Sequence, residues 1–119
     1  GEGGEAPKKK RKKIEITQEE YDGMSGMMVG ELRKREELDE DDMTQEDLVN
    51  WYLDLRDDID SEEGLIEAKR KALGVIQRLI QIDHTLVVLN LDELADITPE
   101  SKRRDARKLA VHPNANADL

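Results

Sequence analysis

The sequence predicts a mainly α-helical domain that ends in a small two-stranded β-hairpin, an α+β fold. Three segments repeat apolar residues every three or four positions, the spacing of a helix that buries one face. Two later segments are short and partly β-branched, which is typical of strands. The chain has 119 residues, enough for one small domain, and its core must be built without phenylalanine.

Both ends of the chain are predicted to lie outside this domain. Residues 1–13 carry six bases and two acids, whereas the rest of the chain carries 13 bases and 27 acids. We expect a disordered basic lead over residues 1–15, a folded domain over 16–114 and a disordered tail over 115–119. Because the first residue is not methionine, we expect the chain to be a piece of a longer protein.

The lead contains an unbroken run of bases that is typical of a nuclear import signal. The run consists of Lys8, Lys9, Lys10, Arg11, Lys12 and Lys13. The import interpretation predicts a nuclear protein. The alternatives are a solvated basic tail and a tail that meets DNA by charge alone.

The first helix is predicted to begin at Thr17, because Thr17 and Glu20 have the spacing of a capping box. Its apolar stripe consists of Tyr21, Met24, Met28 and Leu32. Three glycines weaken this helix, each by roughly 1 kcal/mol relative to alanine. The helix therefore needs support from packing against the rest of the domain.

The second helix is predicted to start at Thr44, after an acidic linker at residues 36–43. Asp47 falls in its first turn, where the helix dipole favours an acid. Its predicted core stripe consists of Leu48, Tyr52, Leu55 and Ile59. Trp51 and Val49 flank that stripe.

The third helix is predicted to be long, over residues 62–82, with Ser61 as its N-cap. One apolar stripe consists of Leu65, Ala68, Ala72, Val75, Leu79 and Ile82. A second stripe beside it consists of Ile66, Leu73, Ile76 and Ile80. Together the stripes predict a wide buried face.

The C-terminal part is predicted to form the hairpin. Residues 85–91 and 108–113 are the expected strands, and residues 92–106 between them are expected to be a loop with a basic tip. Three helices followed by a hairpin are the layout of a winged helix, a helix-turn-helix variant whose hairpin forms the wing.

Composition and motifs give no indication of an enzyme. There is no Walker loop, dinucleotide fingerprint or nucleophile elbow, and there is no cysteine. His84 and His112 stand without an obvious carboxylate partner, so we interpret them as structural residues and expect no metal and no cofactor. No apolar run approaches 18 residues, so we expect no membrane span.

An acidic cluster between the second and third helices is the first candidate site. It consists of Asp57, Asp58, Glu62, Glu63 and Glu67, with Leu65 among them and Asp60 beside them. Acids at a helix N-terminus are stabilising by about 0.3–1 kcal/mol each, so two would serve the helix. The excess favours a docking site for a basic partner, in which charge steers the encounter and an apolar anchor supplies affinity. The alternative is a solvated turn.

A basic surface is the second candidate site, and it would contact DNA through the third helix and the wing. It consists of Lys69, Arg70, Lys71, Arg78, Lys102, Arg103, Arg104 and Arg107, with Lys108 nearby. Glu67 and Asp105 interrupt it, and the body around it is strongly acidic. The sequence therefore predicts weak or no DNA binding by this domain.

Several motifs together resemble one family. LVNWYL (48–53), IDSEEGLIEAKR (59–70), VIQRL (75–79), DH (83–84) and LAVHPN (109–114) are similar to the C-terminal winged-helix domains of minichromosome maintenance subunit six. The resemblance runs from about Ile16 to Asn114. Its motifs are weakest in the first helix and in the wing loop.

The resemblance implies a non-catalytic binding module of a replicative helicase subunit. The full-length protein would join five other subunits in an ATP-driven ring, with its ATPase residues upstream of this chain. The partner implied is the licensing factor that loads the ring, which would contact the acidic surface through a basic segment. Glu62, Glu63 and Leu65 match the family motif, whereas Gly64 stands where the family has a further acid. We expect the isolated domain to be monomeric.

Overall fold

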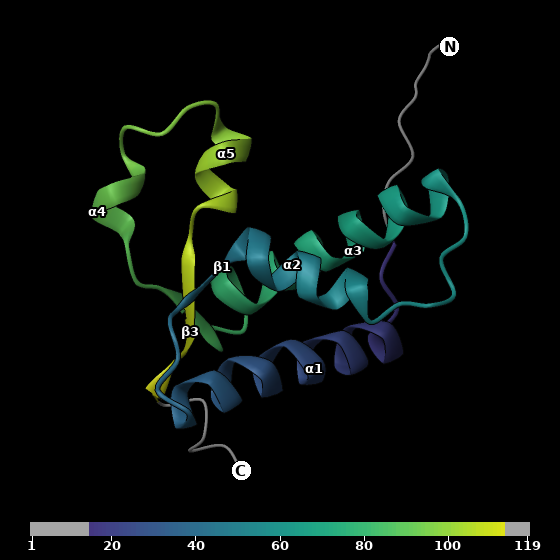
Figure 1. The fold of residues 1–119 in the computed structure, drawn as a ribbon, viewed down its shortest axis with the longest axis horizontal. Coiled ribbons are helices and arrows are strands. Elements are labelled where there is room, and N and C mark those ends of the chain that lie inside the picture. The colour runs from purple at the N-terminus through teal and green to yellow at the C-terminus, as the bar shows by residue number, and fades with distance from the viewer. Residues whose placement is uncertain (1–14, 114–119) are drawn as a thin grey trace.

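The structure, a computed structural model, describes residues 15–113, so the predicted import signal at residues 8–13, the rest of the lead up to residue 14 and the tail at 115–119 lie outside the described residues. Its strands are interspersed among the helices (Figure 1). In order they are α1 (Gln18–Glu37), β1 (Met43–Thr44), α2 (Gln45–Asp54), α3 (Glu62–Gln81), β2 (Leu86–Val88), α4 (Leu91–Leu94), α5 (Glu100–Asp105) and β3 (Lys108–Val111). The α+β winged-helix class predicted from the sequence is confirmed.

The three long helices begin where their caps predicted. The Thr17 hydroxyl accepts the Glu20 N–H, and the Glu20 carboxylate accepts the Thr17 N–H, which completes a capping box. Thr44 and Asp47 form the same reciprocal pair at the start of α2. At α3, the Ser61 hydroxyl accepts the Gly64 N–H at 3.0 Å. Each cap satisfies a backbone donor that the first helical turn leaves unpaired.

The wing is a three-stranded antiparallel sheet, whereas the sequence predicted two strands. The strand order is β1-β3-β2, with Met43 opposite Leu109 and Leu86 opposite Val111. Of the predicted acidic linker, residues 36–37 continue α1 and Met43 enters β1. Met43 is buried, so its apolar side chain explains why this short segment joins the sheet.

The prediction of a featureless loop at residues 92–106 was wrong, because this segment contains most of α4 and all of α5. Its base is closed by Asn90, whose side-chain amide donates to the Ala106 carbonyl and accepts the Lys108 N–H. Leu94 is buried. Arg103 donates to the Ile97 carbonyl and ties α5 to the segment between α4 and α5. Figure 1 shows α4 and α5 standing above the sheet.

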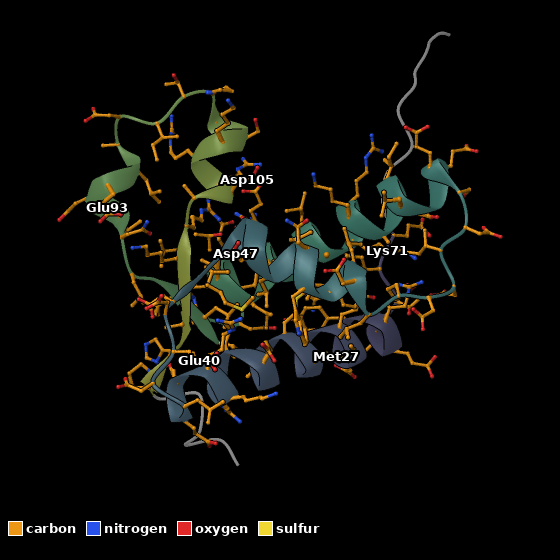
Figure 2. All side chains as sticks on the ribbon, in the orientation of Figure 1. Met27, Glu40, Asp47, Lys71, Glu93 and Asp105 are labelled. Carbon is orange, nitrogen blue, oxygen red and sulfur yellow. The ribbon has the colours of Figure 1, made fainter. Side chains whose placement is uncertain are left out.

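The core lies where α1, α2 and α3 meet the inner face of the sheet. It consists of Tyr21, Met24, Met28, Leu32, Met43, Leu48, Val49, Tyr52, Ala72, Val75, Ile76, Leu79, Leu86, Leu109 and Val111. The predicted stripe of the first helix is therefore confirmed. Charged side chains such as Glu40, Asp47 and Glu93 lie around the outside of the domain (Figure 2).

Parts of the other predicted stripes lie outside the core. Leu55 is exposed because α2 ends at Asp54, one residue before it. Leu65, Ile66 and Ile82 are exposed as well, because they sit at the ends of α3, beyond the helices that cover its middle. The buried part of α3 is therefore shorter than its apolar pattern.

Two glycines of α1 are expected to limit its stability. A Cβ atom at Gly26 or Gly30 would meet nothing within 4 Å, so alanine fits without strain. Gly26→Ala and Gly30→Ala should each raise the free energy of unfolding by about 0.5–1 kcal/mol. Thermal unfolding followed by circular dichroism measures this. Gly74→Ala is the matched control, because its Cβ would lie 3.0 Å from Ile16 Cδ1. An equal gain at all three positions would contradict the packing argument.

Candidate protein-interaction surface

The connection between α2 and α3 is fixed by one arginine. Arg56 makes two 2.8 Å hydrogen bonds to Asp58, from Nε to Oδ1 and from Nη2 to Oδ2. Its Nη1 also donates to the Tyr52 hydroxyl at 2.9 Å. The guanidinium carbon lies 5.8 Å from the centre of the Tyr52 ring. A forked contact of this kind holds a loop in one geometry better than a single ion pair does.

The Arg56 contact changes the charge of the predicted acidic surface. Its hydrogen bonds lower the pKa of Asp58 to about 2 and raise the pKa of Arg56 further above its ordinary value, with Tyr52 adding to the rise. Asp58 is therefore ionised and paired at neutral pH. Among residues 15–113, by contrast, no ion pair involves Asp57, Glu62 or Glu63. Within these residues, the charges of the three carboxylates are not offset by a paired base.

Acid is expected to release the Arg56 contact. The lowered pKa of Asp58 means that its contribution to stability is present above about pH 4 and is lost as the pH falls toward about 2. We expect Asp58→Asn to remove this part of the acid dependence. Unfolding midpoints between pH 5 and pH 2 measure the difference from the wild type, with Asp57→Asn as the control. Parallel pH profiles for all three chains would contradict the assignment.

Leu65 lies in the open beside these acids. It is 43% exposed. Glu62 and Glu63, which precede it at the start of α3, are exposed too. The structure therefore brings together an exposed leucine and unpaired carboxylates at the start of one capped helix. An apolar side chain surrounded by acids is the arrangement that a basic, partly apolar segment fits.

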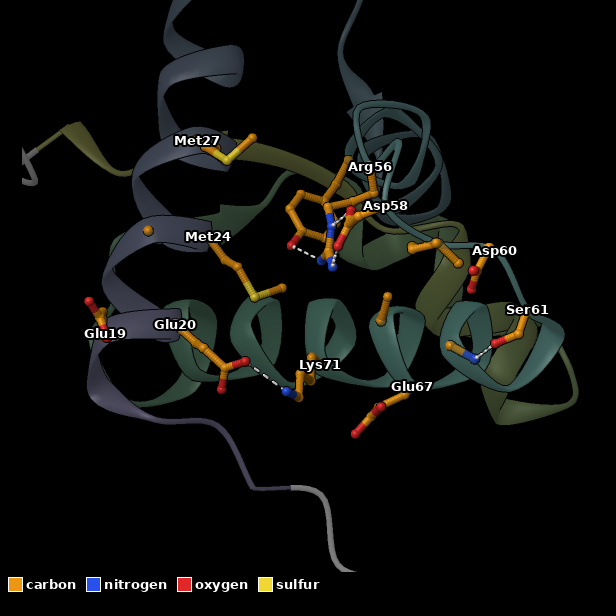
Figure 3. Close-up of a pocket in the computed structure, with 15 residues that line it drawn as sticks. Glu19, Glu20, Met24, Met27, Arg56, Asp58, Asp60, Ser61, Glu67 and Lys71 are labelled. Atoms are coloured by element: carbon orange, nitrogen blue, oxygen red, sulfur yellow. Dashed lines mark hydrogen bonds and ion pairs between the residues drawn. The ribbon is translucent and has the colours of Figure 1, made fainter.

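A groove lies beside this surface, between the N-terminal half of α1 and the α2–α3 connection. Its volume is about 460 Å³. Figure 3 shows Met24 reaching from α1 toward Arg56 and Asp58, with α3 forming the floor between them. Of the predicted partner residues, Asp58 and Glu67 line the groove, whereas Asp57, Glu62, Glu63 and Leu65 lie outside it.

Lys71 links α3 to α1 at the edge of the groove. Its Nζ lies 2.7 Å from Glu20 Oε2. The hydrogen bond from Lys71 lowers the pKa of Glu20, and the bond from Glu20 raises the pKa of Lys71. Lys71 was predicted to belong to a basic DNA surface, but in the structure its charge is used within the domain.

The other predicted DNA-binding bases differ in how far they are engaged within the domain. Arg78 packs over the Tyr21 ring at 4.1 Å, so it faces α1. Arg104 pairs with Glu100 at 2.6 Å. Arg107 donates to Gln77, and burial lowers its pKa. Lys69, Arg70 and Lys102 are exposed. Exposed bases are therefore few and divided between α3 and α5.

Some residues of this surface were missed by the sequence reasoning. Glu20 was interpreted only as a capping-box residue and Glu19 was given no role, yet both line the groove. Met27 is 42% exposed and also lines it. The available signal was that Met27 lies off the apolar stripe of the first helix and next to Gly26. An apolar residue on the polar side of an amphipathic helix needs an explanation.

Among residues 15–113, no three His, Asp or Glu side chains lie together in a group that could hold a metal ion. The His112 N–H donates to the Thr85 carbonyl, which continues the pairing of β2 and β3. His84 has a φ of 55°, at the turn that leads into β2. None of the described helices combines the length and hydropathy of a membrane span.

Comparisons with known proteins agree on one family. A model of the family described as MCM6 C-terminal winged-helix domain matches residues 12–117. The maternal DNA replication licensing factor mcm6 of Xenopus tropicalis is 39% identical over 108 residues, which cover 85% of this chain and 13% of that protein. DNA replication licensing factor Mcm6 of Anopheles gambiae is 32% identical over 92% of the chain and 14% of its own length. DNA replication licensing factor MCM6 of Arabidopsis thaliana is 31% identical over 86% of the chain and 14% of its own length. The chain spans about an eighth of the length of such relatives, and it belongs to the family of MCM6 C-terminal winged-helix domains.

Proposed function

We propose that this domain is a non-catalytic protein-interaction module that docks a basic segment of the licensing factor that loads the replicative helicase. The surface that we assign to docking is the α2–α3 junction, with Glu62, Glu63 and Leu65 at its centre. Asp57 and Glu67 extend the negative charge on either side. Asp58 holds the connection in shape through Arg56.

The exposure of Leu65 is the observation that carries this proposal. Leu65 is 43% exposed, unlike the buried Leu48 and Leu79, and it lies beside acids that have no ion pair within residues 15–113. Apolar anchors surrounded by polar groups supply much of the free energy of protein association. Complementary charges raise the association rate and select basic partners.

The role of the whole protein is proposed from its relatives, which are named DNA replication licensing factors. We infer that the full-length protein is one subunit of a hetero-hexameric, ATP-driven DNA helicase and works in the nucleus. Its ATP-binding residues would lie upstream, so this chain needs no cofactor of its own. The other subunits would then be partners of the full-length protein.

Binding to DNA through α3 and the wing has less support. Lys71, Arg104 and Arg107 are engaged within the domain, and exposed carboxylates such as Glu67 share the α3 surface. Strong duplex binding needs several bases that reach phosphates together. We expect no mobility shift of duplex DNA at low salt when residues 1–13, which could bind DNA by charge alone, are removed. All members of the core lie within residues 21–111, so this shorter chain keeps its core.

A titration tests both functions side by side. The isotope-labelled domain is titrated with the loading factor and, separately, with duplex DNA, each at low and at high salt. Docking predicts that backbone signals of Glu62, Glu63 and Leu65 shift with the loading factor and shift less at high salt. No response at these residues would overturn the proposed surface. A response of Lys69 and Arg70 to duplex DNA would favour the alternative.

A further inference from the structure

We propose that the groove between α1 and the α2–α3 connection is the docking site of the chain's own basic lead, residues 8–13. This inference goes beyond the proposed function, because its occupant is a segment of the same chain. Three features of the domain support it: the charge of the groove, its apolar lining and the point at which the lead joins α1.

The groove has an excess of negative charge. Its acids are Glu19, Glu20, Asp58, Asp60 and Glu67, and its bases are Arg56 and Lys71. The two bases are already used, since Arg56 pairs with Asp58 and Lys71 pairs with Glu20. Three carboxylates, on Glu19, Asp60 and Glu67, have no ion pair within residues 15–113. An added cationic segment would meet these unpaired charges first.

Part of the lining of the groove is apolar. Gly23, Met24 and Met27 of α1 contribute to it, together with Ala68 of α3. Met24 and Ala68 are buried, whereas Met27 is 42% exposed, and a Cβ at Gly23 would meet nothing within 4 Å. Lysine and arginine cover apolar surface with their methylene stems while their charges stay at the rim. Methionine adapts its shape to such flexible stems.

The lead joins the domain at the rim of this groove. The Thr17 N–H donates to Glu20 at 3.1 Å, and Glu20 lines the groove. Lys13 lies four residues before Thr17, so it reaches about 14 Å from that point, and Lys8 reaches about 31 Å. The floor from Lys71 back to Ser61 is ten helical residues, or about 15 Å. Residues 8–13 therefore reach far enough from Thr17 to lie along the whole groove.

The tether favours this occupant over a free peptide of the same charge. A short linker keeps the lead at an effective concentration of about millimolar, so weak contacts suffice. Residues 8–13 bring six bases and no acid, whereas residues 14–119 are strongly acidic. Asp58 and Glu67 belong both to the groove and to the predicted partner surface. The lead would therefore compete with a basic partner for these residues. Only this competition rests on the proposed function.

The four methionines of the chain allow a direct test. Met24 and Met27 line the groove, whereas Met43 is buried in β1 beyond the far end of α1. The chain has no cysteine, so Ala6→Cys carries a single spin label in the 119-residue protein. Docking predicts that the label weakens the methyl signals of Met24 and Met27 severalfold more than that of Met43. At about 1 M salt, where charges are screened beyond about 3 Å, the difference should fall to the smaller value that the tether alone produces.

Matched charge variants decide whether the groove is responsible. Glu19→Gln, Asp60→Asn and Glu67→Gln together should abolish the preferential broadening. The control set of Glu36→Gln, Glu37→Gln and Asp41→Asn removes the same charge at the other end of α1 and should preserve it. The proposal is overturned if Met24 and Met27 broaden no more than Met43 at low salt, or if the groove variant broadens like the control. Broadening that appears only between labelled and unlabelled molecules would instead identify a second copy as the occupant and would also overturn it.

Discussion

Leu48→Ala is expected to lower the free energy of unfolding by about 2–5 kcal/mol, the usual cost of removing a fully buried leucine side chain. Leu48 is 0% exposed and lies in α2 at the centre of the core. The cavity would remain unfilled because neighbours from three helices fix its walls. For a domain of this size the midpoint of thermal unfolding should fall by more than about 10 °C.

Leu55→Ala is the matched control for this prediction. Both leucines belong to the stripe that the sequence assigned to the core, but Leu55 is 50% exposed at the C-cap of α2. Its truncation should cost less than about 1 kcal/mol, because it creates no cavity. Chemical unfolding of both variants measures the difference. Equal losses would mean that α2 continues into the connection and that Leu55 packs inside the domain.

The helix starts could be predicted because capping is local. Thr17 with Glu20, Thr44 with Asp47, and Ser61 each act within three residues, a distance that the sequence shows directly. The end of α2 could not be predicted in this way. The apolar pattern continues to Ile59, but the chain leaves the helix and Arg56 folds back onto Asp58. A side-chain contact of this kind sets the path of the chain after α2, but it does not alter the helical spacing of the apolar residues.

The wing was predicted in outline only. β2 and β3 were recognisable from their own residues, whereas β1 has two residues and is defined by its pairing with β3. α4 and α5 are equally short, and a segment of four to six residues has little helical preference of its own. Their position depends on contacts such as those of Asn90 with Ala106 and Lys108. Contacts between residues far apart in the chain produce no regular spacing that the sequence would show.

The candidate surface likewise has one part that the sequence predicted and one part that it did not. Glu62, Glu63 and Leu65 lie within one helical turn, so their proximity followed from the sequence. The groove depends on Glu20 meeting Lys71, which lies 51 positions along the chain. The packing of α1 beside α3 brings them together, and the charge pattern of either helix alone does not reveal it. The sequence therefore predicted the acidic junction but not its extension toward α1.

The second prediction with a large expected effect concerns Leu65. Leu65→Ala should weaken binding of the loading factor by about tenfold or more, because truncation of an interface anchor costs at least about 1–2 kcal/mol. The stability of the domain should change by less than about 1 kcal/mol, since the side chain is 43% exposed. Isothermal titration calorimetry gives the affinity, and thermal unfolding of the same sample gives the stability.

Two controls separate an interface role of Leu65 from general surface effects. Leu89→Ala removes an equally exposed leucine, at 50%, from the wing and should leave binding unchanged. Glu62→Gln with Glu63→Gln should weaken binding and reduce its salt dependence, whereas Glu36→Gln with Glu37→Gln removes the same charge from the end of α1 and should do neither. A large loss of stability in Leu65→Ala would assign Leu65 to the core. Unchanged affinity in a stable Leu65→Ala domain would remove the apolar anchor, and the partner would then have to bind through charge alone.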